Sequence, residues 1–152
     1  MDAGKKVIAT NKKAYHDFFI LDTYECGIVL TGTEIKSVRQ NKISINEAYC
    51  FIEEKELFVG GIHIAKYEKG NIFNHDEARN RKLLAHKREI IRLESKVKEK
   101  GLTIIPLSVY LIEGIAKVEI ALVKGKKLYD KREDLKIKTA HRAIEKSLKN
   151  RY

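Results

Sequence analysis

Two pairs of apolar segments, each pair joined by a short polar turn, constrain the fold of this chain most. Glu54-Lys55-Glu56 separates the first pair, and Glu113-Gly114 separates the second. Within each segment apolar side chains alternate with polar ones or run together, which is typical of β-strands, and short turns of this kind join antiparallel neighbours. The sequence therefore predicts two β-hairpins, formed by residues 48–53 with 57–64 and by residues 103–112 with 116–123.

Three helices are predicted around these hairpins. A short helix capped by Asn11 is expected to end near Phe18, and a strand bent at Gly27 should follow it over residues 19–30. An amphipathic helix is expected to start near Thr31 and to end near Gln40. A longer helix is predicted from Arg81, with Glu94 paired to Lys98 and Gly101 as its stop signal. Residues 65–80 read as a polar loop, and the single proline, Pro106, should lie at an edge, a bulge or an interruption of a strand ladder.

These elements fit an oligonucleotide-binding (OB-type) antiparallel β-barrel with about three flanking helices. A chain of 152 residues with 43% hydrophobic content is long enough to bury one such core. We expect the barrel to occupy residues 1–123 and a basic C-terminal tail to occupy residues 124–152. Cys26 and Cys50 lack the spacing of a zinc site or a disulfide framework and are predicted to be core thiols.

The charge balance points to a polyanionic partner. The formal net charge is +10, and residues 124–152 alone hold 11 basic residues against 4 acidic ones. A membrane-spanning segment is not expected, because the longest uncharged run, residues 101–112, is far shorter than the roughly 20 apolar residues that a bilayer requires. No apolar stretch follows the N-terminal residues as a secretory signal would, so the protein is predicted to be cytoplasmic.

Two further groups of charged residues are candidates for a nucleic-acid site. Glu34 lies among cations and either balances their charge or accepts hydrogen bonds from a base edge. Six cations within fourteen residues form either a phosphate-binding surface or a solvated helix face: Arg79, Arg81, Lys82, Lys87, Arg88 and Arg92. The adjacent pair His16-Asp17 has no nucleophile motif near it, and no metal-ligand spacing is present, so we expect no catalytic residues, no metal and no cofactor.

The tail has the pattern of a basic amphipathic helix. Wound at 100° per residue, its cations form one stripe and small apolar side chains form the opposite side. Like charges four residues apart weaken such a helix in isolation. We therefore predict a tail that is disordered when free and helical against RNA. A membrane-surface helix is the rival interpretation, although the apolar side lacks Trp and Phe.

Four motifs in order resemble the small protein B family, which binds transfer-messenger RNA in bacterial ribosome rescue. The motifs are residues 11–17, residues 27–39, residues 79–90 and residues 125–133. The resemblance implies an OB-type barrel that is not an enzyme and that binds the tRNA-like domain of transfer-messenger RNA. It also implies delivery of the alanyl-charged RNA, with elongation factor Tu, to stalled ribosomes.

The resemblance also implies which residues act. Those for RNA binding, with the neighbouring cations, are Glu34, Lys36, Arg79, Arg81, Lys82, Leu84 and His86. For small-subunit RNA at the decoding centre and along the mRNA path it implies Tyr129, Asp130, Lys131 and Arg132 with the helix after them. We add the basic residues of the tail to this predicted ribosome-binding set: Lys126, Lys127, Lys138, Arg142 and Lys146. The chain departs from the family's usual residues at Glu77 and Ala85. Two alternatives remain open: a general single-strand-binding barrel that stacks bases on aromatic side chains, and an RNA-processing enzyme.

Overall fold

The structure is a computed structural model that describes residues 4–67 and 74–126. Most of the predicted ribosome-contact residues lie outside these ranges: Lys127, Tyr129, Asp130, Lys131, Arg132, Lys138, Arg142 and Lys146. Within the described ranges the chain forms nine strands and three helices. These are β1 (Lys5–Thr10), α1 (Ala14–Asp17), β2 (Phe18–Ile28), α2 (Gly32–Arg39), β3 (Ile43–Ser44), β4 (Tyr49–Glu53), β5 (Glu56–Gly60), β6 (His63–Ile64), β7 (Arg81–Leu84), α3 (Lys87–Lys100), β8 (Thr103–Ile112) and β9 (Ile115–Gly125).

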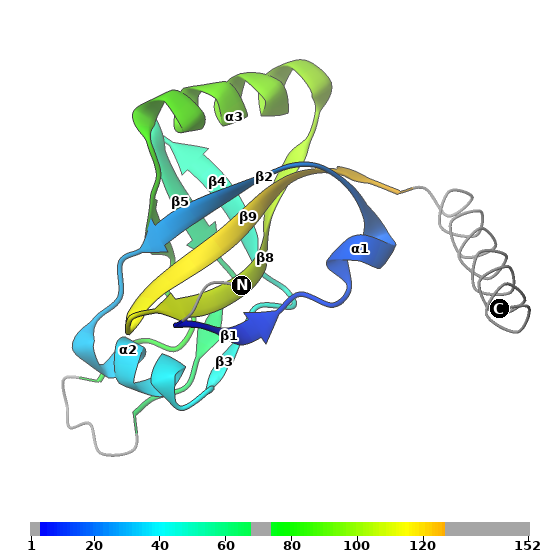
Figure 1. The fold of residues 1–152 in the computed structure, drawn as a ribbon. Coiled ribbons are helices and arrows are strands. Elements are labelled where there is room, and N and C mark those ends of the chain that lie inside the picture. The colour runs from blue at the N-terminus through cyan, green and yellow to red at the C-terminus, as the bar shows by residue number, and fades with distance from the viewer. Residues whose placement is uncertain (1–3, 68–73, 127–152) are drawn as a thin grey trace, which may run out of the picture.

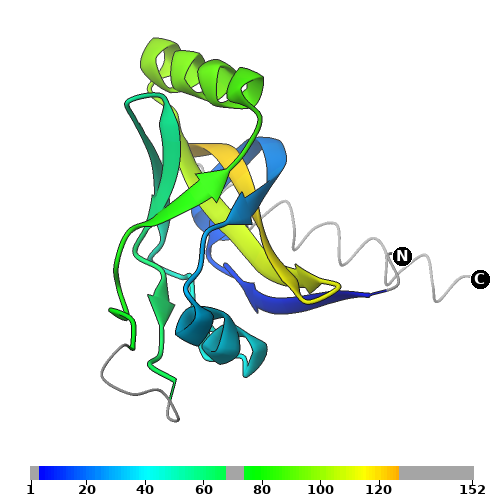
Figure 2. The same ribbon diagram turned by 90° about the vertical axis from the view of Figure 1, so that its left-hand side faces the viewer.

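Six of the strands close into a ring of antiparallel pairs. Starting from β8, the pairing runs through β4, β5, β7, β2 and β9 and returns to β8. A single residue pair, Cys50 with Ile104, joins β4 to β8. β1 adds to the outer edge of β8. Helix α3 lies across one end of this barrel and α2 lies at the opposite end (Figures 1 and 2). The predicted mainly β, OB-type architecture with three flanking helices is confirmed.

The barrel interior is apolar and includes both thiols. Leu57, Val59 and Ile120 are among the side chains that lose all solvent contact in it. Cys26 and Cys50 are buried and unpaired, as predicted for core thiols. Burial raises the pKa of the Cys26 thiol to about 12, because an apolar surrounding disfavours the thiolate.

Irregularities in the ladders match some sequence signals. The register of β8 against β9 shifts between Pro106 and Ser108, which confirms the predicted interruption at the proline. The register of β2 against β9 shifts between Ile20 and Asp22 and is regular at Gly27, where the sequence pattern predicted a bend. Gly27 instead faces Leu84 of β7, whose side chain lies 3.4 Å from the position that a Cβ would occupy.

Two predicted helix starts are wrong. Residues 81–84 form strand β7, and α3 begins only at Lys87. Helix α1 covers Ala14–Asp17, and its N-cap is Lys13 and not Asn11. The Asn11 amide nitrogen donates to the carbonyl of Pro106 at 3.3 Å, and its Oδ1 accepts no hydrogen bond from the described residues. The end of α3 is as predicted, with Gly101 in the left-handed region at φ 61° and an ion pair of 3.7 Å between Glu94 and Lys98. No helix in the described ranges is long and apolar enough to span a membrane.

Candidate nucleic-acid interface

Helix α2 places Glu34 at a defined point of its first turn. The Thr31 hydroxyl accepts a hydrogen bond from the Glu34 N–H at 3.3 Å, and the Glu34 carboxylate accepts one from the Thr31 N–H at 2.8 Å. This reciprocal capping box satisfies two N–H groups that have no partner within the helix. The carboxylate is thereby turned away from solvent and towards β7.

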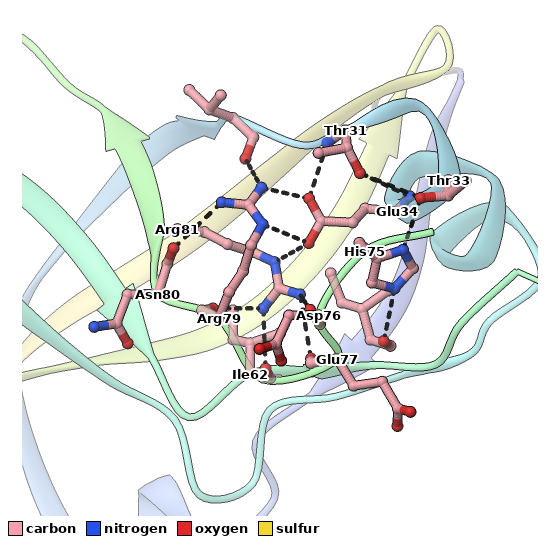
Figure 3. Close-up of polar contacts among 12 residues, drawn as sticks. Thr31, Thr33, Glu34, Ile62, His75, Asp76, Glu77, Arg79, Asn80 and Arg81 are labelled. Carbon is pink, nitrogen blue, oxygen red and sulfur yellow. Dashed lines mark hydrogen bonds and ion pairs between the residues drawn. The ribbon is translucent and has the colours of Figure 1, made fainter. Parts of the chain in front are cut away.

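Two arginines from the segment before and within β7 converge on this carboxylate (Figure 3). Arg81 Nε donates to Glu34 Oε2 at 2.6 Å, and Arg79 Nε donates to the same oxygen at 3.1 Å. Arg79 also donates through Nη2 to Glu34 Oε1. The carboxylate therefore accepts a two-point contact from Arg79, a geometry that fixes the guanidinium plane.

Arg81 has all five of its N–H donors engaged. In addition to Glu34, its guanidinium donates to the backbone carbonyls of Ile62, Arg79, Asp76 and Glu77 at 3.0–3.3 Å. Its side chain, like that of Glu34, has an exposed fraction of 0%. A buried guanidinium is tolerated only when its charge and its donors are matched in this way. In this structure neither Glu34 nor Arg81 presents side-chain surface to a partner.

The electrostatics of the pair follow from this geometry. Burial alone would raise the pKa of Glu34, but the hydrogen bonds from Arg79, from the Thr31 N–H and from Arg81 outweigh burial and lower that pKa below its usual range. Burial also lowers the pKa of Arg81, against the opposing effect of Glu34. A guanidinium starts from so high a value that it remains charged at neutral pH.

A histidine that the sequence pattern did not single out joins the loop before β7 to α2. His75 Nδ1 lies 2.8 Å from the Thr33 hydroxyl, and its Nε2 lies 2.9 Å from the carbonyl oxygen of Ile64. Its ring is buried between these partners, within the predicted polar loop. The spacing of 42 residues between His75 and Thr33 leaves no local signal from which this contact is predictable.

The outer face of β7 carries two of the remaining predicted RNA-binding residues, Lys82 and Leu84. Along the strand Arg81 and Leu83 point into the barrel, so Lys82 and Leu84 point outward. Leu84 is 53% exposed despite being apolar, and Lys82 forms an exposed ion pair of 3.3 Å with Glu56. His86 is exposed and directly precedes the first residue of α3.

The six clustered cations divide between different environments. Arg81 is buried, Arg79 is 33% exposed at its side chain, and Lys82 lies on the outer face of β7. The first turns of α3 carry exposed cations beside an open depression lined by His86, Arg88, Glu89 and Arg92. Lys36 is exposed on α2, and its ammonium lies 5.4 Å from the centre of the Tyr67 ring.

Aromatic side chains gather on the outward face of the β4–β5 hairpin. Phe51 and Phe58 stack across the strands at 5.6 Å between ring centres, and Tyr49 lies 6.0 Å from Phe51. The Tyr49 ring covers Gly60, where a Cβ would come within 2.9 Å of it. Phe58 pairs in register with Lys82, so this aromatic face adjoins β7. Such a face either stabilises the hairpin or offers rings for base stacking.

Known proteins resemble this chain in sequence over most of its length. The SmpB protein family matches residues 8–150. The SsrA-binding protein of Enterococcus hirae is 56% identical over 145 residues, covering 95% of this chain and 94% of the relative. That of Alkaliphilus oremlandii is 55% identical over 148 residues, covering 97% of this chain and 96% of the relative.

A solved structure described as "tmRNA-SmpB: a journey to the center of the bacterial ribosome" contains a chain with 45% sequence identity and a TM-score of 0.66. The match covers 83% of this chain and 92% of that one. With a family match over residues 8–150 and relatives that are more than half identical over nearly their full lengths, this chain belongs to the SmpB family.

Proposed function

We propose that this protein binds the tRNA-like domain of transfer-messenger RNA and brings that RNA to stalled ribosomes in trans-translation. The observation that carries the proposal is the exposed strip formed by Arg79, Lys82, Leu84 and His86, which is backed by a buried ion-pair network. Cations beside an exposed apolar side chain suit a structured RNA, which offers both phosphates and base faces. The SsrA-binding relatives support transfer-messenger RNA as the ligand.

The residues of the site divide into two roles in this proposal. Arg79, Lys82, Leu84 and His86 contact the RNA, with Lys36 and the first turns of α3 as outlying cations. Glu34 and Arg81 do not contact the RNA in this proposal, but they hold Arg79 and the loop before β7 in place. This assignment follows from burial, since only the first group has side-chain surface to offer.

The proposal also covers the state of the RNA, the role of residues 127–152 and the place where the protein works. The RNA arrives in its alanyl-charged form together with elongation factor Tu. Residues 127–152 act on the ribosome, in the mRNA path and at the decoding centre, as a basic segment that becomes helical on binding. The protein works in the cytoplasm as a binding partner and catalyses no step, so the purified protein should neither cleave nor modify the RNA.

The exposed leucine of β7 provides the sharpest test. Leu84→Ser should weaken binding of transfer-messenger RNA by about 1 kcal/mol, close to fivefold in Kd, because it removes apolar area that the RNA would cover. Leu21→Ser is the matched control, since Leu21 is 54% exposed on β2, away from this strip. Gel-shift titration with the purified RNA measures both. Equal affinities of the two variants would show that the strip formed by Arg79, Lys82, Leu84 and His86, the β7 strip, is not part of the RNA interface.

The aromatic face of β4–β5 supports a second candidate function, general binding of single strands by base stacking. The same titrations decide between the two functions when an unrelated single-stranded RNA of equal length is included. The proposed function requires that transfer-messenger RNA binds more tightly, and that Leu84→Ser reduces this preference. A protein that binds both RNAs equally would be a general single-strand-binding barrel.

A further inference from the structure

Lys126, the last described residue, contacts α1 and the start of β2. Its N–H donates to the carbonyl of Asp17 at 2.9 Å, and its ammonium donates to the carbonyl of Tyr15 at 3.1 Å. The same ammonium lies 4.9 Å from the centre of the Phe19 ring. Tyr15 and Lys126 are 111 positions apart, so these contacts tie the end of β9 to a distant part of the chain.

The contacts have a clear physical cause. The carbonyls of Tyr15 and Asp17 belong to the end of α1, where backbone acceptors have no partner within the helix. A lysine ammonium satisfies such acceptors and places positive charge where it is favourable. The aromatic ring adds an attraction for the same cation. Lys126 therefore serves as a remote cap of α1.

Helix α1 is itself anchored to the barrel. Ala14 is buried in a small apolar cluster with Leu107 and Val123, apart from the main core. Just before the helix, the Asn11 N–H donates to the carbonyl of Leu107 at 2.7 Å. Because α1 is fixed on its inner side by β8 and β9, its carbonyls offer Lys126 a rigid attachment point.

We propose that Lys126 is a positioning residue that fixes the direction in which the C-terminal segment leaves the barrel. This inference rests on the proposed role of residues 127–152 on the ribosome. A segment with a fixed origin and direction samples a small volume, which raises its effective concentration at its binding site. The contacts of Lys126 with Tyr15, Asp17 and Phe19 lie on α1 and at the start of β2, far from the residues of β2 that pair with β7. Binding of transfer-messenger RNA to the β7 strip therefore does not require them.

The competing interpretation treats Lys126 as one more cation that contacts ribosomal RNA directly. The two interpretations differ in what the ammonium does. A direct contact uses the charge of the ammonium, whereas the positioning role uses its attachment to the Tyr15 carbonyl. An ammonium has three N–H donors, so one contact does not exclude the other. Substitution of the side chain alone does not separate them, because both interpretations lose the charge.

The first experiment compares Lys126→Met with Lys124→Met in the full-length protein. Lys124 is exposed two residues earlier, near the end of β9, and serves as the charge-matched control. Lys126→Met should lower alanine tagging on stalled ribosomes by about tenfold, as expected for losing a hydrogen bond made by a charged group. Lys124→Met should change tagging by less than about twofold. Affinity for transfer-messenger RNA should be the same in both variants, and Lys126→Arg should restore most of the tagging. Equal loss of tagging in the two methionine variants would overturn the proposal.

The second experiment keeps the charge of Lys126 and changes the direction of the segment that follows it. Two glycines inserted between Lys126 and Lys127 keep the contacts of Lys126 with Tyr15, Asp17 and Phe19 but release the segment that follows. Tagging should fall as it does in Lys126→Met, and full tagging by the insertion variant would overturn the positioning role. A chain with Lys138, Arg142 and Lys146 all changed to Gln tests the premise separately. Normal tagging by this triple variant would refute the proposed role of residues 127–152. If the triple variant is inactive but the glycine-insertion variant tags fully, only the positioning role of Lys126 is refuted.

Discussion

At the scale of single residues, position in the strand decides what each cation does. Arg81 and Lys82 are neighbours in the sequence, yet one is buried with every donor engaged and the other faces solvent. The difference arises from the two-residue period of β7, which turns alternate side chains to opposite faces. The sequence shows that the cluster is basic. Only the contact between Glu34 and Arg81 shows which cation supports the site from inside and which one faces solvent.

Glu34→Gln tests that separation. The substitution keeps the shape of the side chain and removes the charge that compensates Arg81, so the free energy of unfolding at pH 7 should fall by about 3 kcal/mol. Glu94→Gln, which removes an exposed helical pair, should cost less than about 0.5 kcal/mol. Urea unfolding measures both. A Glu34→Gln protein of normal stability that binds transfer-messenger RNA poorly would instead indicate direct contact of the carboxylate with RNA.

The same variant predicts a pH dependence. The pKa of Glu34 is lower in the folded protein than its ordinary value of 4.5, so the unfolded chain binds the proton more tightly. The stabilisation is therefore fully present above about pH 4.5 and is lost as the pH falls towards the lower folded pKa. The stability difference between the original protein and Glu34→Gln should shrink in this acid range. A difference that is constant from pH 7 to pH 3 would contradict the assignment.

At the scale of elements, local signals predicted those whose boundaries are set locally. The capped helix α2, the stop of α3 at Gly101 and both hairpins follow from side chains within a few residues of each boundary. Strand β7 was not predictable, because its inward Arg81 depends on Glu34, 47 residues earlier. Strand β1 was not predicted either, because its mixture of polar and apolar residues forms a strand by pairing with the distant β8.

The two hairpin turns make a quantitative prediction. Glu54 and Lys55 both have positive φ, 50° and 64°, as do Glu113 and Gly114 in the second hairpin, 50° and 80°. Only the second turn has glycine, which adopts this region without steric cost. Lys55→Gly should therefore stabilise the protein by about 0.5–1 kcal/mol, and Gly114→Lys should destabilise it by a similar amount. Thermal unfolding of both variants checks this, and a loss of stability in Lys55→Gly would show that the lysine side chain contributes more than its backbone costs.

At the scale of the whole molecule, ring closure depends on residues far apart in the sequence. Strand β2 pairs along most of its length with β9, and β5 pairs with β7 across the segment that includes the polar loop. The sequence predicted the two hairpins and the OB-type class, but not which strands pair to close the ring. The predicted boundary at residue 123 also falls inside β9, which continues to Gly125. Strand β9 thus ends beside α1, where Lys126 contacts the carbonyls of Tyr15 and Asp17.

The last prediction concerns that basic segment. We expect Ile137→Pro to abolish most alanine tagging on stalled ribosomes while leaving binding of transfer-messenger RNA unchanged. Proline in a helix interior costs about 3 kcal/mol and removes no charge, so the variant separates a helical ligand from a mere cloud of cations. Ile137→Ala is the control, because alanine removes the branched side chain but favours the helix. Like charges four residues apart should keep the segment unfolded in the free protein, which circular dichroism can measure against a chain that lacks it. Full tagging by the proline variant would contradict folding on binding, and a stable helix over residues 134–148 in the free protein would remove the reason for expecting it.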